Sequence, residues 1–274
     1  MRSVVITGAT SGIGKAAALG LAAHGFQVIG TARTTEKADK LTAAAAESGH
    51  RVRAVLLDVT DPGSCQDAVA EIAELTGGGP WALVNNAGLA VGGAFEDVSE
   101  ADARAVLETN LLGVARMTRL VLPSMRRRGE GRIVQMSSVA GLIATPLNGW
   151  YSAGKYALEA LTDVLRREIA ASGIRVSLIE PGFIDTPMLS EGIARLPAHT
   201  RYAEAYEAAG RLIARRRPLG PDAVARTVRR ALTAPNPRRR YSVGHEARMA
   251  RLSRLLPPAT VDVTMRACLR LNRV

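Results

Sequence analysis

The chain has 274 residues, which is enough to bury a substantial core in one large domain or two small ones. Hydrophobic residues make up 47% and charged residues 22%, which excludes a disordered or fibrous protein. Two cysteines, Cys65 and Cys268, are too few for a disulfide framework and lack metal-ligand spacing, so we expect a cytoplasmic protein without a metal site. The first apolar run, residues 4–6, is too short for a signal peptide, and no later run reaches membrane-spanning length.

The net charge of +11 raises the question of a nucleic-acid partner. Arginine runs occur at residues 126–128, 215–217 and 238–240, in separate segments without a recognition helix or aromatic stacking pattern. Solvated surface is the simpler interpretation, and a polyanion-binding role is the alternative. Either way, the charge favours long-range attraction of an anionic cofactor or substrate.

Short apolar runs rich in β-formers alternate with helix-length segments along most of the chain. The expected strands are 4–7, 27–31, 52–57, 82–85, 132–137, 175–179 and 240–243. The expected helices are 14–24, 35–48, 62–76, 101–128, 150–172 and 221–234. Strands that are apolar on both faces and separated by helices predict a single α/β domain. Its sheet is a Rossmann-type, doubly wound parallel sheet of about seven strands.

Two regions break this alternation. Residues 186–220 hold a small helical insert, which we place within a domain spanning residues 1–244. Residues 245–274 form an extension with apolar residues at helical spacing and Arg between them. A helical extension packed on the same domain, near a pocket mouth or a partner subunit, is one interpretation; a basic surface for peripheral membrane contact is the other.

The first strand ends in TGATSGIG, with glycines at positions 8, 12 and 14. This differs from the usual G-x-G-x-x-G spacing, but it offers similar physics. Glycines permit a tight turn and a close backbone approach, and the following helix begins with free N–H groups. Such a helix N-terminus suits a pyrophosphate. A turn that serves packing alone is the competing interpretation.

Arg33 follows the second strand, in the segment VIGTAR. In NAD-binding folds, an acidic residue near this position takes the ribose 2′-hydroxyl. No acidic residue is present here, and a guanidinium can bind a 2′-phosphate through paired hydrogen bonds. NADP is therefore predicted in preference to NAD.

Further motifs follow in order: Asp58-Val59, NNAG at 85–88, Asn110, Ser138, a tyrosine and lysine four residues apart, and PGFIDTPM at 181–188. Together with TGATSGIG they resemble the short-chain dehydrogenase/reductase family in its compact single-domain form. The resemblance extends over residues 3–190 by motif. It implies a hydride-transfer enzyme.

The resemblance implies a catalytic set of Tyr151, Lys155, Ser138 and Asn110. Tyr151 would exchange a proton with the substrate oxygen, and Lys155, one turn later on the same helix face, would favour its phenolate form. Ser138 would stabilise the developing negative charge, and Asn110 would hold a water that links Lys155 to solvent. The implied NADP contacts are Gly8, Thr10, Ser11, Gly12, Ile13, Gly14, Arg33, Asp58, Val59, Asn86, Ala87, Gly88, Tyr151, Lys155, Pro181, Gly182, Ile184 and Thr186.

The predicted substrate lining is largely apolar, with two tyrosines as polar handles. It consists of Leu142, Ile143, Phe183, Met188, Leu189, Tyr202 and Tyr206. Such a lining suits a bulky hydrophobic ketone or alcohol of steroid, retinoid, lipid or polyketide type. The alternatives are a 3-oxoacyl-thioester reductase and a non-catalytic NADP-binding sensor. Long helices at 101–128 and 150–172 often pair between subunits in this family, so a homodimer or homotetramer is expected.

Overall fold

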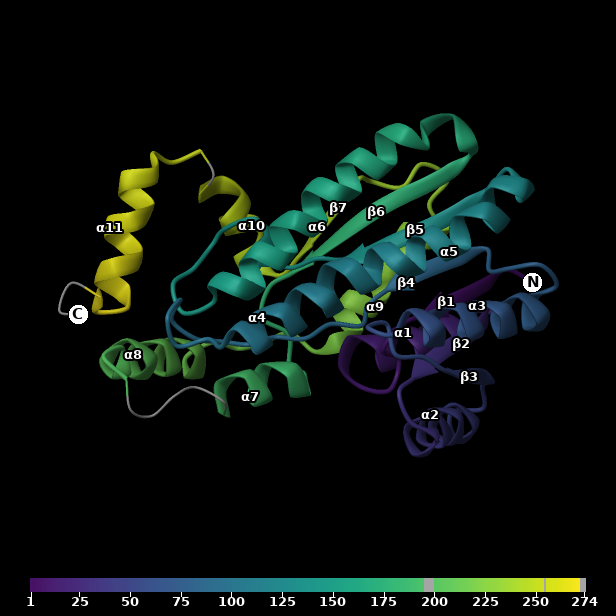
Figure 1. Ribbon diagram of the computed structural model, residues 1–274, viewed down its shortest axis with the longest axis horizontal. Coiled ribbons are helices and arrows are strands. Elements are labelled where there is room, and N and C mark those ends of the chain that lie inside the picture. Colours follow the sequence, from purple (N-terminus) through teal and green to yellow (C-terminus); the bar gives the residue numbers. More distant parts are fainter. Residues whose placement is uncertain (195–199, 254, 272–274) are drawn as a thin grey trace.

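Seven strands form one sheet in the order β3-β2-β1-β4-β5-β6-β7, and every neighbouring pair is parallel (Figure 1). The computed structural model describes residues 1–194, 200–253 and 255–271. The strands are β1 (Ser3–Ile6), β2 (Gln27–Ala32), β3 (Val52–Leu56), β4 (Ala82–Asn85), β5 (Gly131–Met136), β6 (Ile174–Pro181) and β7 (Arg240–Val243). The predicted doubly wound sheet is therefore confirmed. Its strand order reverses between β1 and β4, which is where such folds bind ligands.

The α-helices in the described ranges follow the predicted alternation closely. They are α1 (Gly12–Ala22), α2 (Thr35–Glu47), α3 (Pro62–Thr76), α4 (Glu100–Leu107), α5 (Gly113–Arg128), α6 (Gly149–Glu168), α7 (Pro187–Ala194), α8 (Ala203–Ala214), α9 (Pro221–Thr233), α10 (His245–Ser253) and α11 (Pro258–Cys268). None of these helices is both long and apolar enough to cross a membrane.

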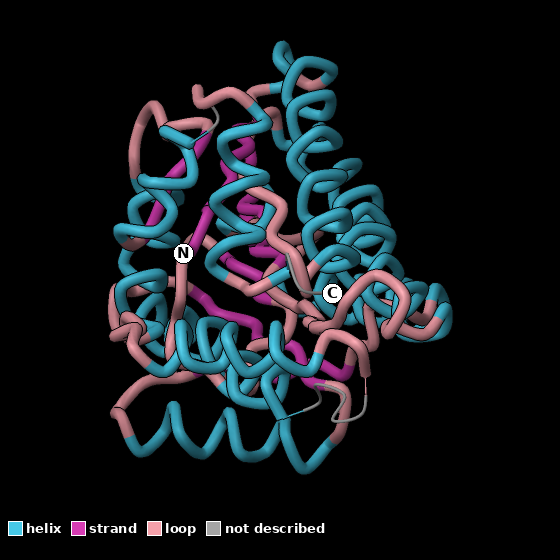
Figure 2. Tube along the Cα trace, turned by 90° about the vertical axis from the view of Figure 1, so that its left-hand side faces the viewer, coloured by secondary structure: helices cyan, strands magenta, loops and turns pink. Residues whose placement is uncertain are grey.

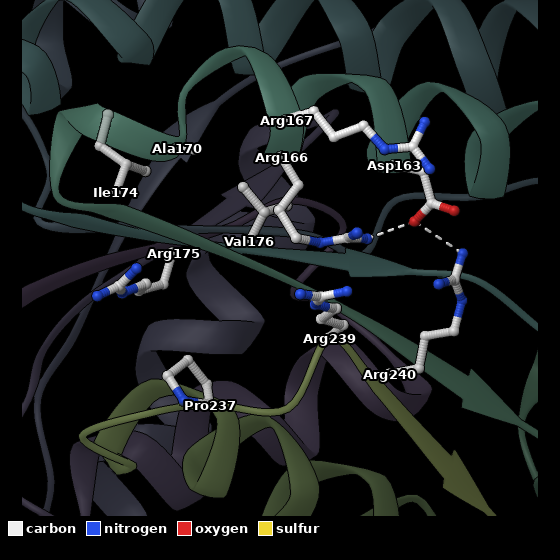
Figure 3. Close-up of a pocket in the computed structure, with 10 residues that line it drawn as sticks. All are labelled: Asp163, Arg166, Arg167, Ala170, Ile174, Arg175, Val176, Pro237, Arg239 and Arg240. Carbon is white, nitrogen blue, oxygen red and sulfur yellow. Dashed lines mark hydrogen bonds and ion pairs between the residues drawn. The ribbon is translucent and has the colours of Figure 1, made fainter.

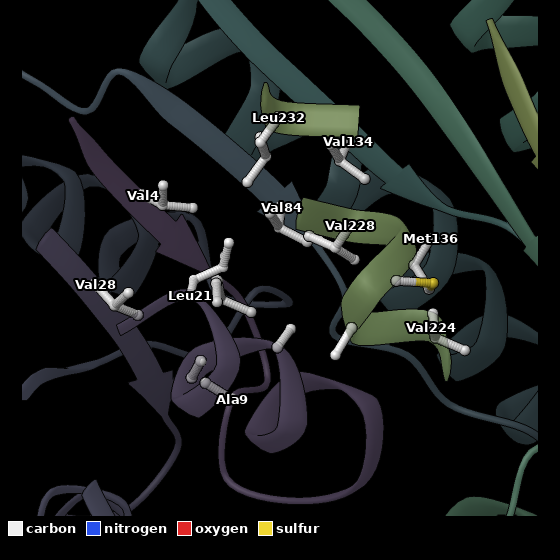
Figure 4. Packing of buried hydrophobic residues seen from close by; sticks show 14 of the residues in the cluster. Val4, Ala9, Leu21, Val28, Val84, Val134, Met136, Val224, Val228 and Leu232 are labelled. Carbon is white, nitrogen blue, oxygen red and sulfur yellow. The ribbon is translucent and has the colours of Figure 1, made fainter. Parts of the chain in front are cut away.

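Helices cover both faces of the sheet, because successive strand side chains point to opposite sides. Val4 and Ile6 belong to a core formed with α1, α2 and α9, whereas Val5 belongs to a second core formed with α3 and α5. Figure 2 shows the strands lying between these helical layers, and Figure 4 shows Leu21 of α1 and Val228 of α9 packed on the first face. Both faces are apolar, as the continuous hydrophobic strand runs predict.

The helix expected over 101–128 is interrupted. A π-helical turn, Glu108–Leu112, separates α4 from α5. Such turns insert an extra residue into a helix and are frequent at functional sites. Asn110 lies in this turn with no solvent exposure.

The insert forms α7 and α8, and its residues 195–199 lie outside the described ranges. The extension forms α10 and α11, which are separate helices because Pro257 and Pro258 break the chain between them. No residue of α11 is buried, and Figure 1 shows α11 standing beyond the end of the sheet, above α8.

Candidate active site and cofactor cleft

The turn after β1 requires glycine. Gly8 has φ +64°, a left-handed conformation that L side chains rarely adopt. At Gly14 a Cβ would lie 2.2 Å from the carbonyl oxygen of Gly8, so the start of α1 packs directly on the turn. A Cβ on Gly12 would lie 3.0 Å from Cγ2 of Thr186. The glycine spacing therefore brings two backbone segments and the 181–188 segment into close contact.

The N-terminus of α1 is open. Ser11 occupies the N-cap position, but its side chain makes no capping hydrogen bond. The first N–H groups of a helix have no intrahelical acceptor, and they carry the positive end of the helix dipole. This arrangement fits a pyrophosphate, with Thr10 half-buried and Ser11 exposed beside it.

Thr7 is a positioning residue that the sequence interpretation missed. Its Oγ1 accepts hydrogen bonds from the backbone N–H groups of Asn86 and Ala87, both 2.9 Å long. In return, Nδ2 of Asn86 donates to the carbonyls of Thr7 at 3.0 Å and Gly8 at 3.1 Å. Asn86 thus ties the ends of β1 and β4 together. A buried threonine at a strand end gave no distinctive sequence signal.

Arg33 is exposed immediately after β2, and Asp58 follows β3, the neighbouring strand. Burial raises the pKa of Asp58, but hydrogen bonds from Thr60 and the charge of Arg33 outweigh this, so the pKa lies below its ordinary value. Val59 is buried beside Asp58. The two expected cofactor positions therefore lie near each other at the same end of the sheet.

Tyr151, Lys155 and Ser138 come together where β5 leads into α6. Lys155 Nζ lies 5.6 Å from the centroid of the Tyr151 ring and donates a 2.8 Å hydrogen bond to the carbonyl of Met136. Ser138 caps a short 3₁₀ turn by accepting from the N–H of Ala140 at 3.1 Å. The backbone just before Ser138 therefore holds Lys155, and Ser138 interacts with Tyr151.

The ionisation of this pair differs from our expectation. Burial raises the pKa of Tyr151 above its ordinary value, and the Ser138 hydroxyl only partly offsets this. Burial also lowers the pKa of Lys155, to about 8, despite the opposing charge of Glu159. The predicted lowering of the Tyr151 pKa by Lys155 is therefore not found, because burial dominates the pKa shift of each group.

The side chain of Asn110 is held by the loop after β4. Its Nδ2 donates to the carbonyl of Leu89 at 2.7 Å, and its Oδ1 accepts from the N–H of Leu89 at 2.9 Å. A Cβ on Gly88 would lie 3.2 Å from Oδ1 of Asn110, and one on Gly154 would lie 3.8 Å from its Cβ. Asn110 thus lies between this loop and α6, next to Gly154, the residue that precedes Lys155.

Behind Lys155 lies a buried acid that the sequence interpretation did not single out. Glu159 is one helical turn further along α6 and only 7% exposed. Its Oε2 accepts from Nε of Arg240 at 2.9 Å. Burial raises the pKa of Glu159, while the Ser137 hydroxyl and Arg240 oppose the rise. The only sequence signal was an acid at i+4 from the lysine.

The segment after β6 closes the cleft opposite α1. Pro181 and Ile184 are buried, and Gly182 donates its N–H to the carbonyl of Val243 at 2.8 Å. A Cβ on Gly182 would lie 2.8 Å from Oε2 of Glu246, so α10 packs against this turn. Half-buried Thr186 then faces Gly12 across the cleft.

The predicted substrate residues occupy several different environments. Leu142 is buried, whereas Ile143 and Leu189 are half-buried. Met188 is 37% exposed, with its Cε 3.5 Å from where a Cβ on Gly88 would lie. The guanidinium of Arg216 covers the Phe183 ring, 4.8 Å from the centroid.

The two predicted polar handles, Tyr202 and Tyr206, lie at the start of α8. The Tyr206 hydroxyl donates to Asp97 at 2.7 Å and accepts from the N–H of Ala94 at 2.6 Å. Burial raises the pKa of Tyr206 to about 12. Tyr206 is thus a latch between α8 and the loop after β4, whereas Tyr202 is half-buried near Glu96.

A cavity of about 470 Å³ lies between α11 and the loop that precedes α6. Its walls include Ala144, Thr145 and Pro146 from the loop and Val261 and Met265 from α11. Within the described ranges, no group of three or more His, Cys, Asp and Glu side chains could hold a metal ion.

A family model described as short chain dehydrogenase matches residues 2–195. The chain is 38% identical to the "uncharacterized oxidoreductase YbbO" of Escherichia coli strain K12, covering 95% of this chain and 93% of that protein. It is 36% identical to human retinol dehydrogenase 5, covering 96% and 87%. A solved structure of an actinorhodin polyketide ketoreductase variant with NADPH superposes with a TM-score of 0.76 at 32% identity, covering 88% of this chain and 95% of that one. The chain therefore belongs to the short chain dehydrogenase family of oxidoreductases, as its motifs predicted.

Proposed function

We propose that this dehydrogenase uses NADP(H) to interconvert a bulky hydrophobic carbonyl compound and its secondary alcohol. The observation that carries the proposal is the convergence of Tyr151, Ser138 and Lys155 beside an open helix N-terminus. The nicotinamide, when bound, supplies or accepts the hydride. The remaining chemistry belongs to side chains of this chain.

The cleft fits such a cofactor, because the N-cap side chain of α1 leaves the first N–H groups of the helix uncapped, and the glycine turn lets the backbone pack closely around them. The N–H groups at the start of α1 would hold the pyrophosphate, and Arg33 the 2′-phosphate. The proposed cofactor contacts otherwise remain those implied by the motifs, among them Asp58, Val59, Gly88 and Thr186. Preference for NADP rests on the exposed guanidinium of Arg33 and the lack of an acid at this point of β2.

In the reductive direction, the Tyr151 hydroxyl would donate its proton to the carbonyl oxygen of the substrate. Its raised pKa keeps it protonated at neutral pH, as a general acid requires. The Ser138 hydroxyl would donate a hydrogen bond to the same oxygen and stabilise its developing charge. Lys155 would hold the nicotinamide ribose and pass a proton to Tyr151, and Asn110 would fix the route to solvent.

An apolar substrate is supported by the apolar side chains of Leu142, Ile143, Phe183, Met188 and Leu189, which would line the space around the proposed reaction centre. The retinol dehydrogenase relative carries the name of a bulky apolar alcohol. The polyketide ketoreductase, whose structure contains NADPH, supports a ketone. We further propose that α10 and α11 pack on the dehydrogenase domain beside this entrance, where α11 lines the cavity next to residues 144–146.

A 3-oxoacyl thioester is the second candidate substrate, favoured by the basic run at 215–217 beside the same entrance. Arg215 and Arg217 are exposed there, and would attract an acidic carrier protein.

Peripheral membrane contact is the second candidate role for the extension, residues 245–274. Its Leu252, Leu255 and Val263 side chains are more than half exposed.

Oxidation of NADPH measured against ketones, aldehydes and acyl thioesters graded by size tests these assignments. Rates that rise with apolar bulk would support the first proposal, and a preference for carrier-bound thioesters would favour the second. Binding of NADPH without turnover of any compound would indicate a sensor instead. The Tyr151→Phe variant serves as the control for background oxidation.

A homodimer or homotetramer is proposed from one exposed face of α6. Tyr156, Leu161 and Val164 on this helix are 39%, 43% and 44% exposed. Sedimentation analysis of the wild-type chain would show a dimer or tetramer, and a monomer at micromolar concentration would contradict this proposal.

A further inference from the structure

Arginine residues gather along the amino-terminal edge of the sheet, opposite the proposed catalytic end. Arg2 precedes β1, Arg132 and Arg175 are the second residues of β5 and β6, and Arg239 precedes β7. The starts of β5 and β6 lie side by side, and β7 begins beside them, with Arg240 opposite Leu178 of β6. Residues far apart in the sequence therefore form one basic edge.

Like charges are forced together at this edge. Arg132 and Arg175 are direct partners in the register of β5 and β6. Arg2 and Arg132 both lie over the buried ring of Trp81, at 4.5 and 5.6 Å from its centroid. Like charges directly opposite each other destabilise a strand pair. Burial and the charges of Arg175 and Arg2 lower the pKa of Arg132, and the charge of Glu130 only partly offsets this.

A cavity of about 390 Å³ opens at the same edge, between the end of α6 and the starts of β6 and β7. Its charged lining comprises Asp163, Arg166, Arg167, Arg175, Arg239 and Arg240. Figure 3 shows Arg166 and Arg240 both directed at the one acid, Asp163, from α6 and β7. The lining of the cavity thus holds five guanidinium groups and one carboxylate, and Arg240 also pairs with Glu159 and Glu180 outside the cavity.

Several guanidinium groups of this cavity have N–H donors that no carboxylate of the described residues accepts from. Within the described ranges, Arg167, Arg175 and Arg239 have no carboxylate within 4 Å of their guanidinium groups. Nε of Arg166 is buried and has no acceptor among the described residues. Guanidinium groups bind phosphate oxygens through paired, charge-assisted hydrogen bonds.

We propose that this cavity binds a small polyphosphate anion, of the size of a diphosphate or triphosphate. Its volume lies within the range of about 300–1,000 Å³ typical of small-molecule sites. No aromatic residue lines it, and Trp81 nearby is only 4% exposed, so a base has no ring to stack on. Recognition would therefore be of the phosphates alone. This site is independent of the proposed cofactor cleft and of the proposed function.

Calorimetric titration with inorganic tripolyphosphate, in the presence of saturating NADPH, tests the site. The double variant Arg175→Ala/Arg239→Ala should lose about tenfold or more in affinity. The control variant Arg226→Ala/Arg230→Ala removes the same charge from exposed positions of α9, and should change the affinity by less than about twofold. Thermal melting should show that both variants are folded, because neither removes a buried side chain.

Titrations run with and without NADPH would overturn the proposal if the wild-type chain did not bind, if the two variants lost affinity equally, or if NADPH abolished binding. The last would place the anion in the cofactor cleft. Tight binding of a single-stranded oligonucleotide that depends on Arg175 and Arg239 would also overturn it, in favour of a nucleic-acid surface. The charge-conserving pair Arg175→Lys/Arg239→Lys should retain only part of the affinity, since an ammonium cannot form the paired bonds.

Discussion

The ammonium group of Lys155 lies 5.6 Å from the centre of the Tyr151 ring; Lys155 is buried and Tyr151 is half-buried. Desolvation moves their pKa values apart, because it favours the neutral form of each group and so raises the pKa of Tyr151 and lowers that of Lys155. Lysine therefore titrates near pH 8, while tyrosine remains protonated well above neutrality. The pair is suited to proton donation at neutral pH.

Replacement of Tyr151 by phenylalanine removes the proposed proton donor without changing the shape of the site. We expect the kcat/KM for carbonyl reduction to fall by about 10²–10⁴-fold. NADPH affinity, measured by fluorescence titration, should stay within about threefold of the wild-type value. Turnover close to the wild-type rate would rule out the acid–base role of Tyr151.

The Lys155→Met variant should be inactive but more stable than the wild type. The pKa of Lys155 is about 8 in the fold against 10.5 ordinarily, so burying the charged form costs about 3 kcal/mol. Loss of the hydrogen bond to Met136 offsets about 1–2 kcal/mol of the gain. Urea unfolding at pH 7 should thus show a net stabilisation of about 1–2 kcal/mol.

The difference in stability between Lys155→Met and the wild type should decrease as the pH rises. Between pH 8 and 10.5 the unfolded chain binds more protons than the folded one, so wild-type stability rises with pH across that window. The stability advantage of Lys155→Met should therefore shrink as the pH approaches 10.5. A variant less stable than the wild type at pH 7 would show that the ammonium is not desolvated.

Glu159→Gln should alter the pH profile of the reaction through Lys155. The negative charge of Glu159 raises the pKa of the lysine, and glutamine can still accept the hydrogen bond from Arg240. We expect the pKa that defines the alkaline limb of the kcat/KM profile to fall by about half a pH unit or more. The surrounding charges of Asp163, Glu180 and Arg240 remain, so an unchanged limb would mean that Glu159 serves packing only.

Arg33→Asp tests the proposed cofactor preference. A carboxylate at this position repels a 2′-phosphate and can accept a hydrogen bond from a 2′-hydroxyl. The ratio of kcat/KM for NADPH to that for NADH should fall by about 100-fold. Arg53→Asp, at an exposed position of β3, is the matched control. Its ratio of kcat/KM for NADPH to that for NADH should change by less than about threefold. An unchanged ratio in Arg33→Asp would exclude Arg33 from the 2′-phosphate site.

Removal of the Tyr206 hydroxyl should loosen the insert. In Tyr206→Phe, the N–H of Ala94 and the carboxylate of Asp97 both lose a partner. We expect a loss of about 1–3 kcal/mol in the free energy of unfolding. Tyr202→Phe changes a half-buried ring on the same helix and should cost less than about 0.5 kcal/mol. Equal stability of the two variants would contradict the proposal that the Tyr206 hydroxyl holds α8 to the loop after β4.

The sequence by itself determined the sheet, because strand runs such as 82–85 are apolar on both faces and the residues between them favour helices. It also identified the glycine turn and the Tyr151–Lys155 pair, since these depend on local spacing along one loop and one helix. Family membership followed from the order of those motifs.

Only the tertiary structure decided what depends on contacts between distant segments. The π-turn at Asn110 forms where that side chain meets Leu89, and Thr7 orders the cleft by binding Asn86, 79 residues later. The raised pKa of Tyr151 comes from burial that spacing along a helix does not reveal. The arginine-lined cavity exists because parallel pairing brings the start of β7 beside β6, next to the end of α6. Burial and long-range charge are sums over neighbours, and only the folded chain specifies those neighbours.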